Sequence, residues 1–466
     1  MGSRLDGRAT PQGTRRAAAR FGATARPLGN TGLVVTPLGF GGRRLRDDEL
    51  LHARALRLAL DGGVNLLQAG SRDGGGRSER LVGRVLAEAV RDGAVARDEI
   101  VVVLHLGAAP SESPRQDVSI RALADALGLE HVDVVMLDVA SEPSRDSQGR
   151  LAETFASLEA QVGSGLIGAW GVSSEGFTER EESASYTSLA ALLELAAVVG
   201  GNDHHLAVVG FPLNAFELGA VVNPHADAAG RTTMGVVADA GLGVVVERPL
   251  RGRYSPARPP LRLVEPRGDA PQVAAALAQL RKLEAIWAGE LGRRIRTEAG
   301  DATDLFRWGQ FLAQVMARGD DLSSWERVRY EIVAPHVGQT SAALLANLQG
   351  PDRDAFARWW QAYGTGLHVA FTAIETQLRT TPPHQLVSAA IDPFLPGAWR
   401  SLPLSCRAVA VALSAPISSV AVGMPTPASV AELLALRNAP VLAADPDFVG
   451  LAARTAGLAA ELAQRP

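Results

Sequence analysis

The sequence is poor in two residue types that often carry structure or chemistry. Among its 466 residues it has one cysteine, Cys406, and one lysine, Lys282. A single cysteine excludes a disulfide within the chain and fits a reducing compartment. No apolar run approaches the roughly 20 residues that a membrane-spanning helix needs, and the start, MGSRLDGRAT, lacks the apolar core of a secretory signal. These absences favour a cytoplasmic protein.

An excess of charge of one sign is missing as well. The 46 basic and 50 acidic residues leave a net charge of −4, and aromatic residues, at 5%, are not interleaved with any basic run. So small a net charge gives no basis for binding nucleic acid or an acidic membrane surface. We expect neither partner. A small molecule or a protein remains open as the partner, and an oligomer is compatible with the composition.

Apolar runs that alternate with amphipathic helical segments are abundant. After a predicted hairpin in LGNTGLVVTPLGFGG, near-continuous apolar segments follow one another to Pro249, and an eighth, SSVAVGM, ends at Met424. Such runs, separated by helices, are typical of buried parallel strands joined by right-handed crossovers. Eight of them predict an α/β fold, the (β/α)8 TIM barrel, with strands 1–7 in residues 27–254 and strand 8 with C-terminal helices in 403–466.

Two segments stand outside this alternation. Residues 1–26 are rich in Arg and Ala and are too polar for a core of their own, so we expect an arm that lies on the domain or stays mobile. Residues 255–402, between strands 7 and 8, have helical apolar spacing and predict a large helical insertion. Five of the seven tryptophans fall in the body of the insertion, and a sixth, Trp399, lies at its end. So many tryptophans in one segment indicate either a hydrophobic core or a lid, and we favour the core.

In a barrel of this kind, chemistry is placed at the carboxyl ends of the strands. The polar residues that the sequence puts there are therefore site candidates. In chain order they are Gln68 with Asp73, His105, Asp138, Ser173 with Ser174, Gly210 with Asn214, and Glu247 with Arg248.

Several ordered motifs resemble the aldo-keto reductases. The opening ARPLGNTGLVVTPLGFGG is similar to the start of that family, and six later segments each resemble the family segment expected at that point: GRSERLVGRVLAE, RDEIVVVLHLG, LGLEHVDVVMLD, LIGAWGVSS, GVVVERPLRG and VAVGMPTPASVAELL. The likeness covers residues 26–253 and about 407–436. The insertion and the arm resemble a long bacterial and plant branch of the family.

The resemblance implies a tetrad of Tyr, Lys, Asp and His, with the Tyr as general acid. In this sequence all four positions are substituted: Asp73 stands at the Tyr, His105 at the Lys, Gln68 at the Asp and Asp138 at the His. A tyrosine titrates near ~10 and needs a neighbouring cation to release its proton at neutral pH. Asp73, ionised near ~3.9 in model peptides, has no proton to donate there. With Asp138 and Glu247 nearby, the predicted site is negative and opposes hydride transfer that develops alkoxide charge.

The cofactor positions implied by the resemblance are partly kept. Ser173 matches the first residue of the pair that binds the carboxamide of NADP(H), whereas Ser174 replaces an Asn; Asn214 lies nearby. Glu432 survives at the adenosine end. Backbone amides of Leu250, Arg251 and Gly252 can cradle a pyrophosphate. We therefore expect no firmly bound cofactor, and NADP(H) if there is one.

Three hypotheses follow. The first is a pseudoenzyme with an oxidoreductase-like barrel that binds a ligand or protein partner. The second is an NADP(H)-dependent aldehyde or ketone oxidoreductase with an unorthodox proton donor such as Tyr330 or Tyr363. The third is a repurposed acid/base enzyme that uses His105 and Asp138. A metal site of His105, Asp138 and Asp73 is less favoured than a satisfied polar plug, because no local ligand spacing supports it.

Overall fold

The computed structural model describes residues 1–466 except 1–3, 21–23, 48–49, 71–75, 107–115, 140–144, 265–272, 298–299, 318–321, 380–382, 439–445 and 465–466. The described chain divides into two compact units, residues 1–261 with 387–466, and residues 262–386. The predicted insertion, 255–402, contains the whole of the second unit. Within the described residues, no helix has both the length and the apolar character to cross a bilayer.

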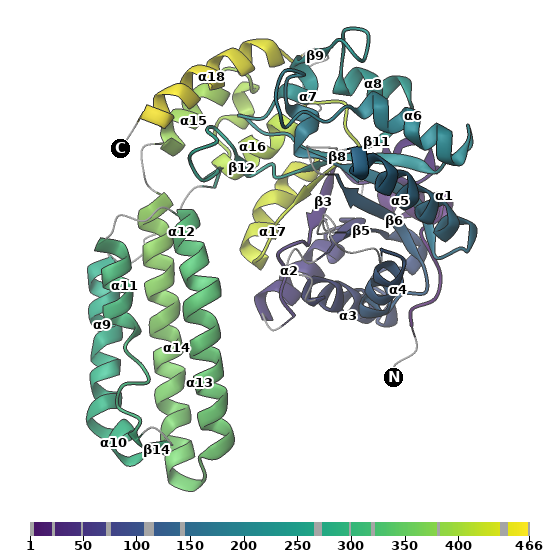
Figure 1. Cartoon of the computed structure of the whole chain (residues 1–466). Helices are drawn as coiled ribbons and strands as arrows, with labels where there is room; N and C mark the ends of the chain where they lie inside the picture. Colours follow the sequence, from purple (N-terminus) through teal and green to yellow (C-terminus); the bar gives the residue numbers. More distant parts are fainter. Residues whose placement is uncertain are drawn as a thin grey trace. The chain divides into compact units, whose positions relative to one another are not determined.

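Eight parallel strands close into a barrel in the first unit (Figure 1). This confirms the predicted (β/α)8 fold. The short hairpin β1 (Arg26–Pro27) and β2 (Val34–Val35) precedes the first barrel strand, as the Asn-Thr-Gly turn predicts. Around the barrel the strands are β3 (Leu38–Gly41), β4 (Leu66–Ala69), β5 (Val101–Leu106), β6 (Val132–Asp138), β7 (Ile167–Ser173), β8 (Leu206–Pro212), β11 (Gly243–Glu247) and β16 (Ser419–Val422).

Helices follow most of these strands and pack on the outside of the barrel. Several begin with a side-chain cap: Ser188 accepts from the amide of Ala191, and Thr232 from that of Gly235. Such caps satisfy amides that have no partner within the helix. The helices are α2 (Leu50–Asp61), α3 (Arg77–Arg91), α4 (Gln116–Leu127), α5 (Arg145–Gly163), α6 (Leu189–Gly200), α8 (Thr233–Asp239), α16 (Leu404–Leu413), α17 (Pro427–Leu434) and α18 (Phe448–Gln464).

The N-terminal arm lies on the barrel. Its helix α1 (Pro11–Arg20) is held by Arg16, whose guanidinium pairs with Asp98 at 2.7 Å. The amide of Ala9 donates to Asp133 Oδ1 at 2.7 Å, and Ala9 belongs to the core cluster that fills the barrel interior. The sequence predicted an arm that either lies on the domain or stays mobile, and in the structure the arm lies on the domain.

The second unit is a bundle of helices around its own core. It contains α9 (Val273–Ile286), a π-helical turn η4 (Trp287–Leu291), α10 (Gly292–Arg294), α11 (Trp308–Ala317), α12 (Leu322–Arg327), a second π-helical turn η5 (Val328–Val333), α13 (Ala334–Asn347) and α14 (Gly350–Arg379). Figure 1 shows α9, α13 and α14 running side by side. Trp287 and Trp325 are fully buried, and Trp308, Trp359 and Trp360 pack against the same cluster. These five tryptophans of the insertion thus form a core.

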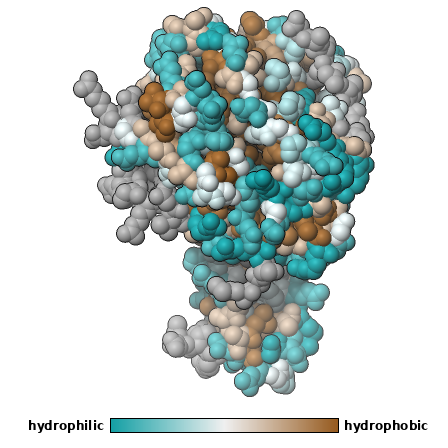
Figure 2. Space-filling model, turned by 90° about the vertical axis from the view of Figure 1, so that its right-hand side faces the viewer, coloured by the Kyte–Doolittle hydropathy of each residue, from teal (hydrophilic) through white to brown (hydrophobic). Residues whose placement is uncertain are grey.

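Hydrophobic residues on the barrel unit are scattered rather than gathered. The face in Figure 2 is mostly hydrophilic, with small separated hydrophobic patches. The most exposed large apolar side chains in this unit are Val198, Val449 and Leu50, which come from three different helices. Single exposed apolar residues of this kind are ordinary on soluble domains.

Candidate functional site

The barrel interior has a polar top layer that follows from the alternation of side chains along a strand. In β5, Val101 and Val103 point into the core cluster, so His105, two residues further on, points inward at the carboxyl end. The same step of two leads from Leu66 to Gln68 in β4 and from Met136 to Asp138 in β6. Applied to β7 and β11, it brings Ser173 and Glu247 into the same layer.

His105 is the centre of this layer and is 3% exposed. Its Nδ1 lies 3.1 Å from Asp138 Oδ1. Its Nε2 lies 2.7 Å from Gln68 Nε2 and 3.3 Å from Glu247 Oε1. Both ring nitrogens are thus occupied by other protein groups. The structure therefore brings together three of the four predicted tetrad positions, whereas Asp73 lies outside the described residues.

Arg43 closes the layer from the side of β3. One end of its guanidinium, NH1, lies 3.2 Å from Glu247 Oε2, and the other, NH2, pairs with Asp138 Oδ2. The remaining oxygen of Glu247 accepts a hydrogen bond of 3.1 Å from Ser173 Oγ. We refer to Gln68, His105, Asp138, Ser173, Glu247 and Arg43 together as the mouth network.

The charge of the mouth network corrects the prediction of an uncompensated negative site. Burial alone raises the pKa of Asp138, but the hydrogen bond and charge of His105 and the charge of Arg43 outweigh it and hold that pKa below its usual value. Burial alone lowers the pKa of Arg43, yet the charges of Glu247 and Asp138 raise it overall. Asp138 therefore stays ionised and Arg43 stays charged at neutral pH. The site therefore contains a cation, the Arg43 guanidinium, but two carboxylates already bind it.

Gly210 in β8 makes room for this arrangement. A Cβ at Gly210 would lie 3.0 Å from Ser173 Oγ and 3.1 Å from Glu247 Oε1. A larger residue at this position would press on both partners. The glycine thus suits a mouth in which Ser173 and Glu247 bond to each other.

Asn214 is bound within the protein rather than free to bind a cofactor. Its Nδ2 donates to Glu217 Oε2 at 2.8 Å and to the carbonyls of Arg248 and Arg251, both at 3.2 Å. Its Oδ1 accepts from the amides of Phe216 and Glu217. The residue joins two loops. Every polar atom of its side chain already has a partner, so it fits a structural role better than contact with a carboxamide.

Arg248 holds the same pair of loops by ion pairs. Its guanidinium pairs with Glu175 at 2.6 Å and with Glu217, and its φ of +50° is a conformation that side-chain-bearing residues rarely adopt. The Glu217 side chain is 9% exposed, and its partial burial raises its pKa even though Arg248 and Asn214 act in the opposite direction. This ionic cluster keeps the loops after β7, β8 and β11 together.

Ser174 is likewise engaged. Its Oγ lies 2.9 Å from Thr187 Oγ1 and accepts from the amide of Gly176 at 3.1 Å, as the cap of a short 3-10 turn. Ser173 and Ser174 are therefore adjacent in sequence but serve different networks. Neither hydroxyl is left without a partner.

The predicted pyrophosphate cradle, Leu250 to Gly252, forms a tight turn in which the amide of Arg251 donates to the Arg248 carbonyl at 3.0 Å. Burial lowers the pKa of Arg251, and among the described residues its guanidinium has no hydrogen-bonding or ionic partner. A Cβ on Gly252 would meet the Phe216 ring at 2.4 Å. Of the predicted cofactor residues, Arg251 is thus the one with an uncommitted charge.

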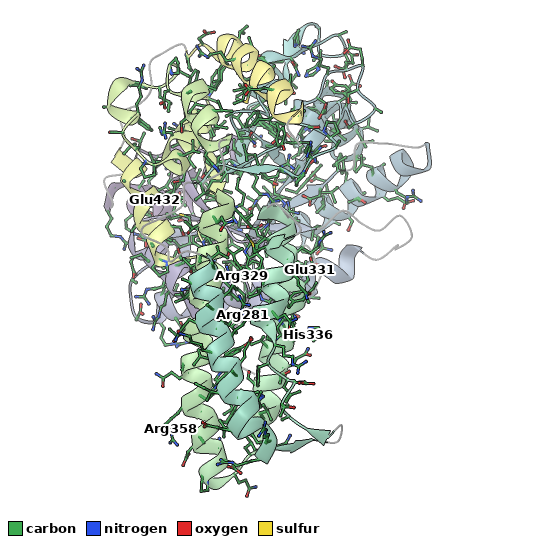
Figure 3. All side chains as sticks on the ribbon, turned by 90° about the vertical axis from the view of Figure 1, so that its left-hand side faces the viewer. Arg281, Arg329, Glu331, His336, Arg358 and Glu432 are labelled. Atoms are coloured by element: carbon green, nitrogen blue, oxygen red, sulfur yellow. The ribbon has the colours of Figure 1, made fainter. Side chains whose placement is uncertain are left out.

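Glu432 in α17, predicted for the adenosine end of a cofactor and labelled in Figure 3, is half-buried. Its carboxylate accepts a hydrogen bond from Ser405 Oγ in α16. Ser429, one turn earlier, exchanges capping bonds with Thr426 at the start of the same helix. Both side chains thus make bonds that stabilise α17 and its packing.

A metal centre finds no support within the described part of the chain. There, no group of three or more His, Cys, Asp and Glu side chains is arranged to hold an ion. The proposed ligand set of His105, Asp138 and Asp73 is tested only in part, since Asp73 is not described. The satisfied polar plug, the favoured interpretation, matches the contacts of His105 and Asp138.

Sequence reasoning missed Arg43, Glu175 and Glu217. Arg43 follows the GFGG end of the first barrel strand, so its place at a carboxyl strand end was the available signal. Glu175 and Glu217 each lie in the loop after a barrel strand, near a candidate residue. No motif marks them, because their role is to pair with arginines that are distant in sequence.

Comparison with known proteins shows what part of this chain is similar to. The model of the aldo/keto reductase family matches residues 37–200, which agrees with the likeness seen in the motifs. Similar solved structures include an aldo-keto reductase from Bacillus halodurans in its holo form, 15% identical, with a TM-score of 0.47 over 93% of this chain and 96% of that one. They also include an aldo/keto reductase from Klebsiella pneumoniae in complex with NADP and acetate, 18% identical, with a TM-score of 0.36 over 48% of this chain and 67% of that one. No curated protein matches the sequence significantly.

Proposed function

We propose that this chain, whose residues 37–200 match the model of the aldo/keto reductase family, keeps that family's barrel but has lost its hydride-transfer chemistry and serves to bind a ligand or a protein partner. A shared barrel does not fix a shared reaction, so the proposal rests on the site. The observation that carries it is the closed mouth network, in which the tetrad-equivalent side chains that the structure describes bond to one another and to Arg43.

A carbonyl reductase needs a group that gives a proton to the developing alkoxide. In the mouth network, Asp138 is held ionised and Gln68 has no acidic proton. The hydroxyl of Ser173 donates to Glu247, and both nitrogens of His105 face protein partners. Within the described residues, none of these groups presents an unengaged proton to a substrate.

One of the two tyrosines named as distant donors, Tyr363, is also engaged. Tyr363 is fully buried in the core of the bundle, where its hydroxyl donates to Glu284 Oε1 at 3.0 Å. Burial, aided by the charge of Glu284, raises the pKa of Tyr363 far above its usual value. These contacts weigh against the oxidoreductase alternative that relies on Tyr363.

The contacts of the cofactor positions support weak affinity for NADP(H). Asn214 and Ser174 are tied to their own loops, while Arg251 offers one free cation to a phosphate. One charge without the carboxamide contacts gives little of the pyridine nucleotide's binding energy. We expect dissociation constants in the millimolar range or no binding.

Calorimetric titration with NADPH and NADP⁺ tests the proposal, together with NADPH oxidation on a panel of aldehydes and ketones. We expect no turnover above the rate without protein. Turnover that disappears in His105→Ala, while the thermal unfolding of that variant stays cooperative, would overturn the proposal. Turnover that survives in that variant points to a contaminating reductase.

A second candidate function has one observation in its favour. The 3.1 Å contact of His105 Nδ1 with Asp138 Oδ1 resembles a carboxylate that orients a histidine base. For catalysis, the Gln68 side chain would have to move away from His105 Nε2, so that this nitrogen could act as the base. Hydrolysis of chromogenic esters tests this candidate: activity that rises in Gln68→Ala and vanishes in Gln68→Ala/His105→Ala favours it over the binding function.

A further inference from the structure

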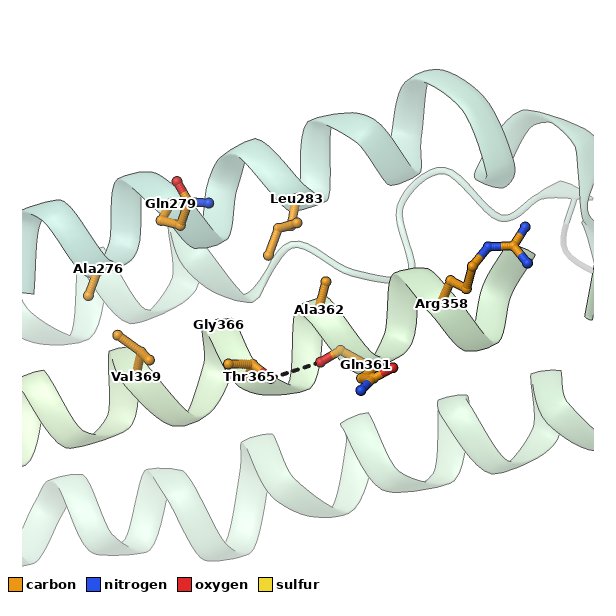
Figure 4. Close-up of a pocket in the computed structure, with 9 residues that line it drawn as sticks. All are labelled: Ala276, Gln279, Leu283, Arg358, Gln361, Ala362, Thr365, Gly366 and Val369. Atoms are coloured by element: carbon orange, nitrogen blue, oxygen red, sulfur yellow. Dashed lines mark hydrogen bonds between the residues drawn. The ribbon is translucent and has the colours of Figure 1, made fainter. Parts of the chain in front are cut away.

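The helical bundle has a pocket of about 490 Å³ between α9 and α14 (Figure 4). Its aliphatic lining belongs to the packing of these two helices, because Ala276 is part of the buried core cluster and Leu283 and Val369 pack against it. The exposed lining is mostly polar. The pocket therefore offers no free apolar surface to a partner.

In the barrel unit, Arg248 has a backbone conformation that its place in the sequence disfavours. Its φ is +50°, a value that residues with a side chain rarely adopt. It also precedes Pro249, and a residue before proline prefers an extended backbone with a negative φ. Such strain persists only where the surrounding contacts hold the backbone in place.

Among the described residues, one other non-glycine residue has a positive φ, and its side chain is not anchored. Ala229, with a φ of +55°, is exposed in the turn between β9 (Pro224–His225) and β10 (Arg231–Thr232). Its methyl group can form neither a hydrogen bond nor an ion pair, so the turn alone holds its backbone. Arg248 differs, because its side chain is itself bound.

Two carboxylates from two other loops hold the Arg248 side chain. Its NH1 donates to Glu175 Oε1 at 2.6 Å, in the loop after β7, and its NH2 pairs with Glu217, in the loop after β8. The Arg248 and Glu217 side chains are only 18% and 9% exposed, so salt screens that pair weakly. We refer to Arg248, Glu175 and Glu217 as the rim latch.

The backbone of Arg248 also shapes the turn that follows β11. Its carbonyl accepts a hydrogen bond of 3.0 Å from the Arg251 amide and one of 3.2 Å from Asn214 Nδ2. These bonds fix the direction in which the chain leaves the strand. The strained residue and its side-chain anchors thus lie at the point where β11 ends.

Glu247, the last residue of β11, is joined directly to this strained residue. Its carboxylate contacts Ser173 Oγ at 3.1 Å, His105 Nε2 at 3.3 Å and Arg43 NH1 at 3.2 Å. A change in the backbone of Arg248 reorients the peptide group that it shares with Glu247. The rim latch is therefore coupled to the mouth network through one peptide bond.

We propose that the rim latch is a conformational switch: its ion pairs hold the strained backbone of Arg248, and this backbone keeps Glu247 in the mouth network. Opening of the latch relieves the strain and withdraws the Glu247 carboxylate. Ser173 Oγ and Arg43 NH1 then lose a partner and become available to a ligand. The inference goes beyond the proposed binding function, because it concerns the position of Glu247 and holds whatever the mouth binds.

Arg248→Ala and Arg248→Gly test the strain. Both remove the ion pairs, but alanine keeps the strain, whereas glycine adopts a positive φ freely. We expect a higher melting temperature for Arg248→Gly than for Arg248→Ala. Glycine loses more conformational entropy on folding than alanine does, so without strain at this position the order would be reversed.

The ring resonances of His105 report the position of Glu247 in the same variants. In NMR spectra of histidine-labelled protein they are assigned by their loss in His105→Gln, and Glu247→Ala gives their position without the carboxylate. Arg248→Ala should move them toward that position, whereas Arg248→Gly should leave them as in the wild type. An arginine that only stabilises the loops would have the same effect in both variants.

Arg253→Ala is the matched control, since Arg253 also pairs with Glu175 but has no positive φ. It should leave the His105 resonances in place. In the wild type, raising NaCl from about 50 to about 500 mM weakens the pair with Glu175, which is 39% exposed, and should move the resonances toward the Glu247→Ala position. The same salt should not move them in Arg248→Gly.

Three results overturn the proposal. The first is a melting temperature of Arg248→Ala equal to or above that of Arg248→Gly. The second is a set of His105 resonances that stays in place in Arg248→Ala, and the third is an equal displacement in Arg253→Ala. If Arg248→Ala does not fold, the salt titration of the wild type decides, and resonances that do not respond to salt overturn the proposal.

Discussion

The barrel mouth and the helical bundle each bury a carboxylate, but they satisfy it in opposite ways. Asp138 is paired with a cation and a histidine, and its pKa is lowered. Glu284 accepts from the Gly309 amide and the Tyr363 hydroxyl without an ion pair among the described residues, and burial raises its pKa. The mouth therefore stabilises charge, whereas the bundle core tolerates one carboxyl that favours its neutral form. That difference separates the polar strand ends of the barrel from the structural core of the bundle.

Among the substitutions that test this comparison, Arg43→Ala is expected to change stability the most. Removal of the guanidinium leaves Asp138 and Glu247, each with only a small exposed fraction, without the arginine that pairs with both. Loss of one partner from a buried ion pair typically costs about 3–5 kcal/mol. We expect the free energy of unfolding of the barrel unit, measured by urea denaturation, to fall by about that amount.

Arg253→Ala provides the control for Arg43→Ala. Arg253 pairs with Glu175, but both side chains are about 40% exposed, at 41% and 39%. Exposed pairs contribute ~0–1 kcal/mol. If the two variants cost the same, the mouth network is no more than a surface feature and the contrast with the bundle fails.

How far the sequence predicts this site depends on whether a contact is local. The alternation of apolar runs and helices predicts the barrel, and the strand ends predict His105 and Asp138 as neighbours, since both follow from the geometry of parallel strands. Arg43 reaches Asp138 across 95 residues of sequence, and its direction depends on its rotamer rather than on any motif. Asn214 and Arg248 were predicted as strand-end residues, but the partners that they bind in other loops were not, for the same reason. Their bonds join segments that only the closed barrel brings together.

A smaller effect is expected in the bundle from Tyr363→Phe. The change removes the hydroxyl that donates to Glu284 but keeps the ring stacked 4.7 Å from Trp359. A buried hydrogen bond to a carboxyl group is worth about 1–2 kcal/mol. Tryptophan fluorescence is a suitable probe, because five of the seven tryptophans lie in residues 262–386. An increase in stability would contradict a net favourable role of this bond.

The stabilisation given by Asp138 and that given by Glu284 are expected to depend on pH in opposite ways. The pKa of Asp138 is lower in the folded state than its model value of 3.8, so its stabilisation is present above that pH and is lost as pH falls through the folded pKa. The pKa of Glu284 is raised above 4.5, so its stabilisation is present below that pH and is lost as pH rises through the folded pKa. Urea denaturation from pH 3 to 7 measures both.

Two isosteric variants separate these contributions. Asp138→Asn should remove the loss of barrel stability below about pH 4, and Glu284→Gln should remove the decline of bundle stability above about pH 4.5. Identical pH profiles for the wild type and either variant would show that the corresponding carboxyl is not the titrating group.

The smallest effect is expected from Ser173→Ala. Its hydroxyl donates to one oxygen of Glu247, but Arg43 holds the other oxygen and His105 lies near the first, so the carboxylate keeps a cation and a ring nitrogen as partners. The loss should be about 0.5–1 kcal/mol in urea denaturation. Ser174→Ala, the adjacent matched change, removes two contacts, to Thr187 and to the Gly176 amide, and should cost more. If Ser173→Ala costs more than Ser174→Ala, Glu247 depends on the serine rather than on Arg43. The mouth would then be held by neutral hydrogen bonds, as the bundle core is, and the distinction between the two regions would lie only in their pKa values.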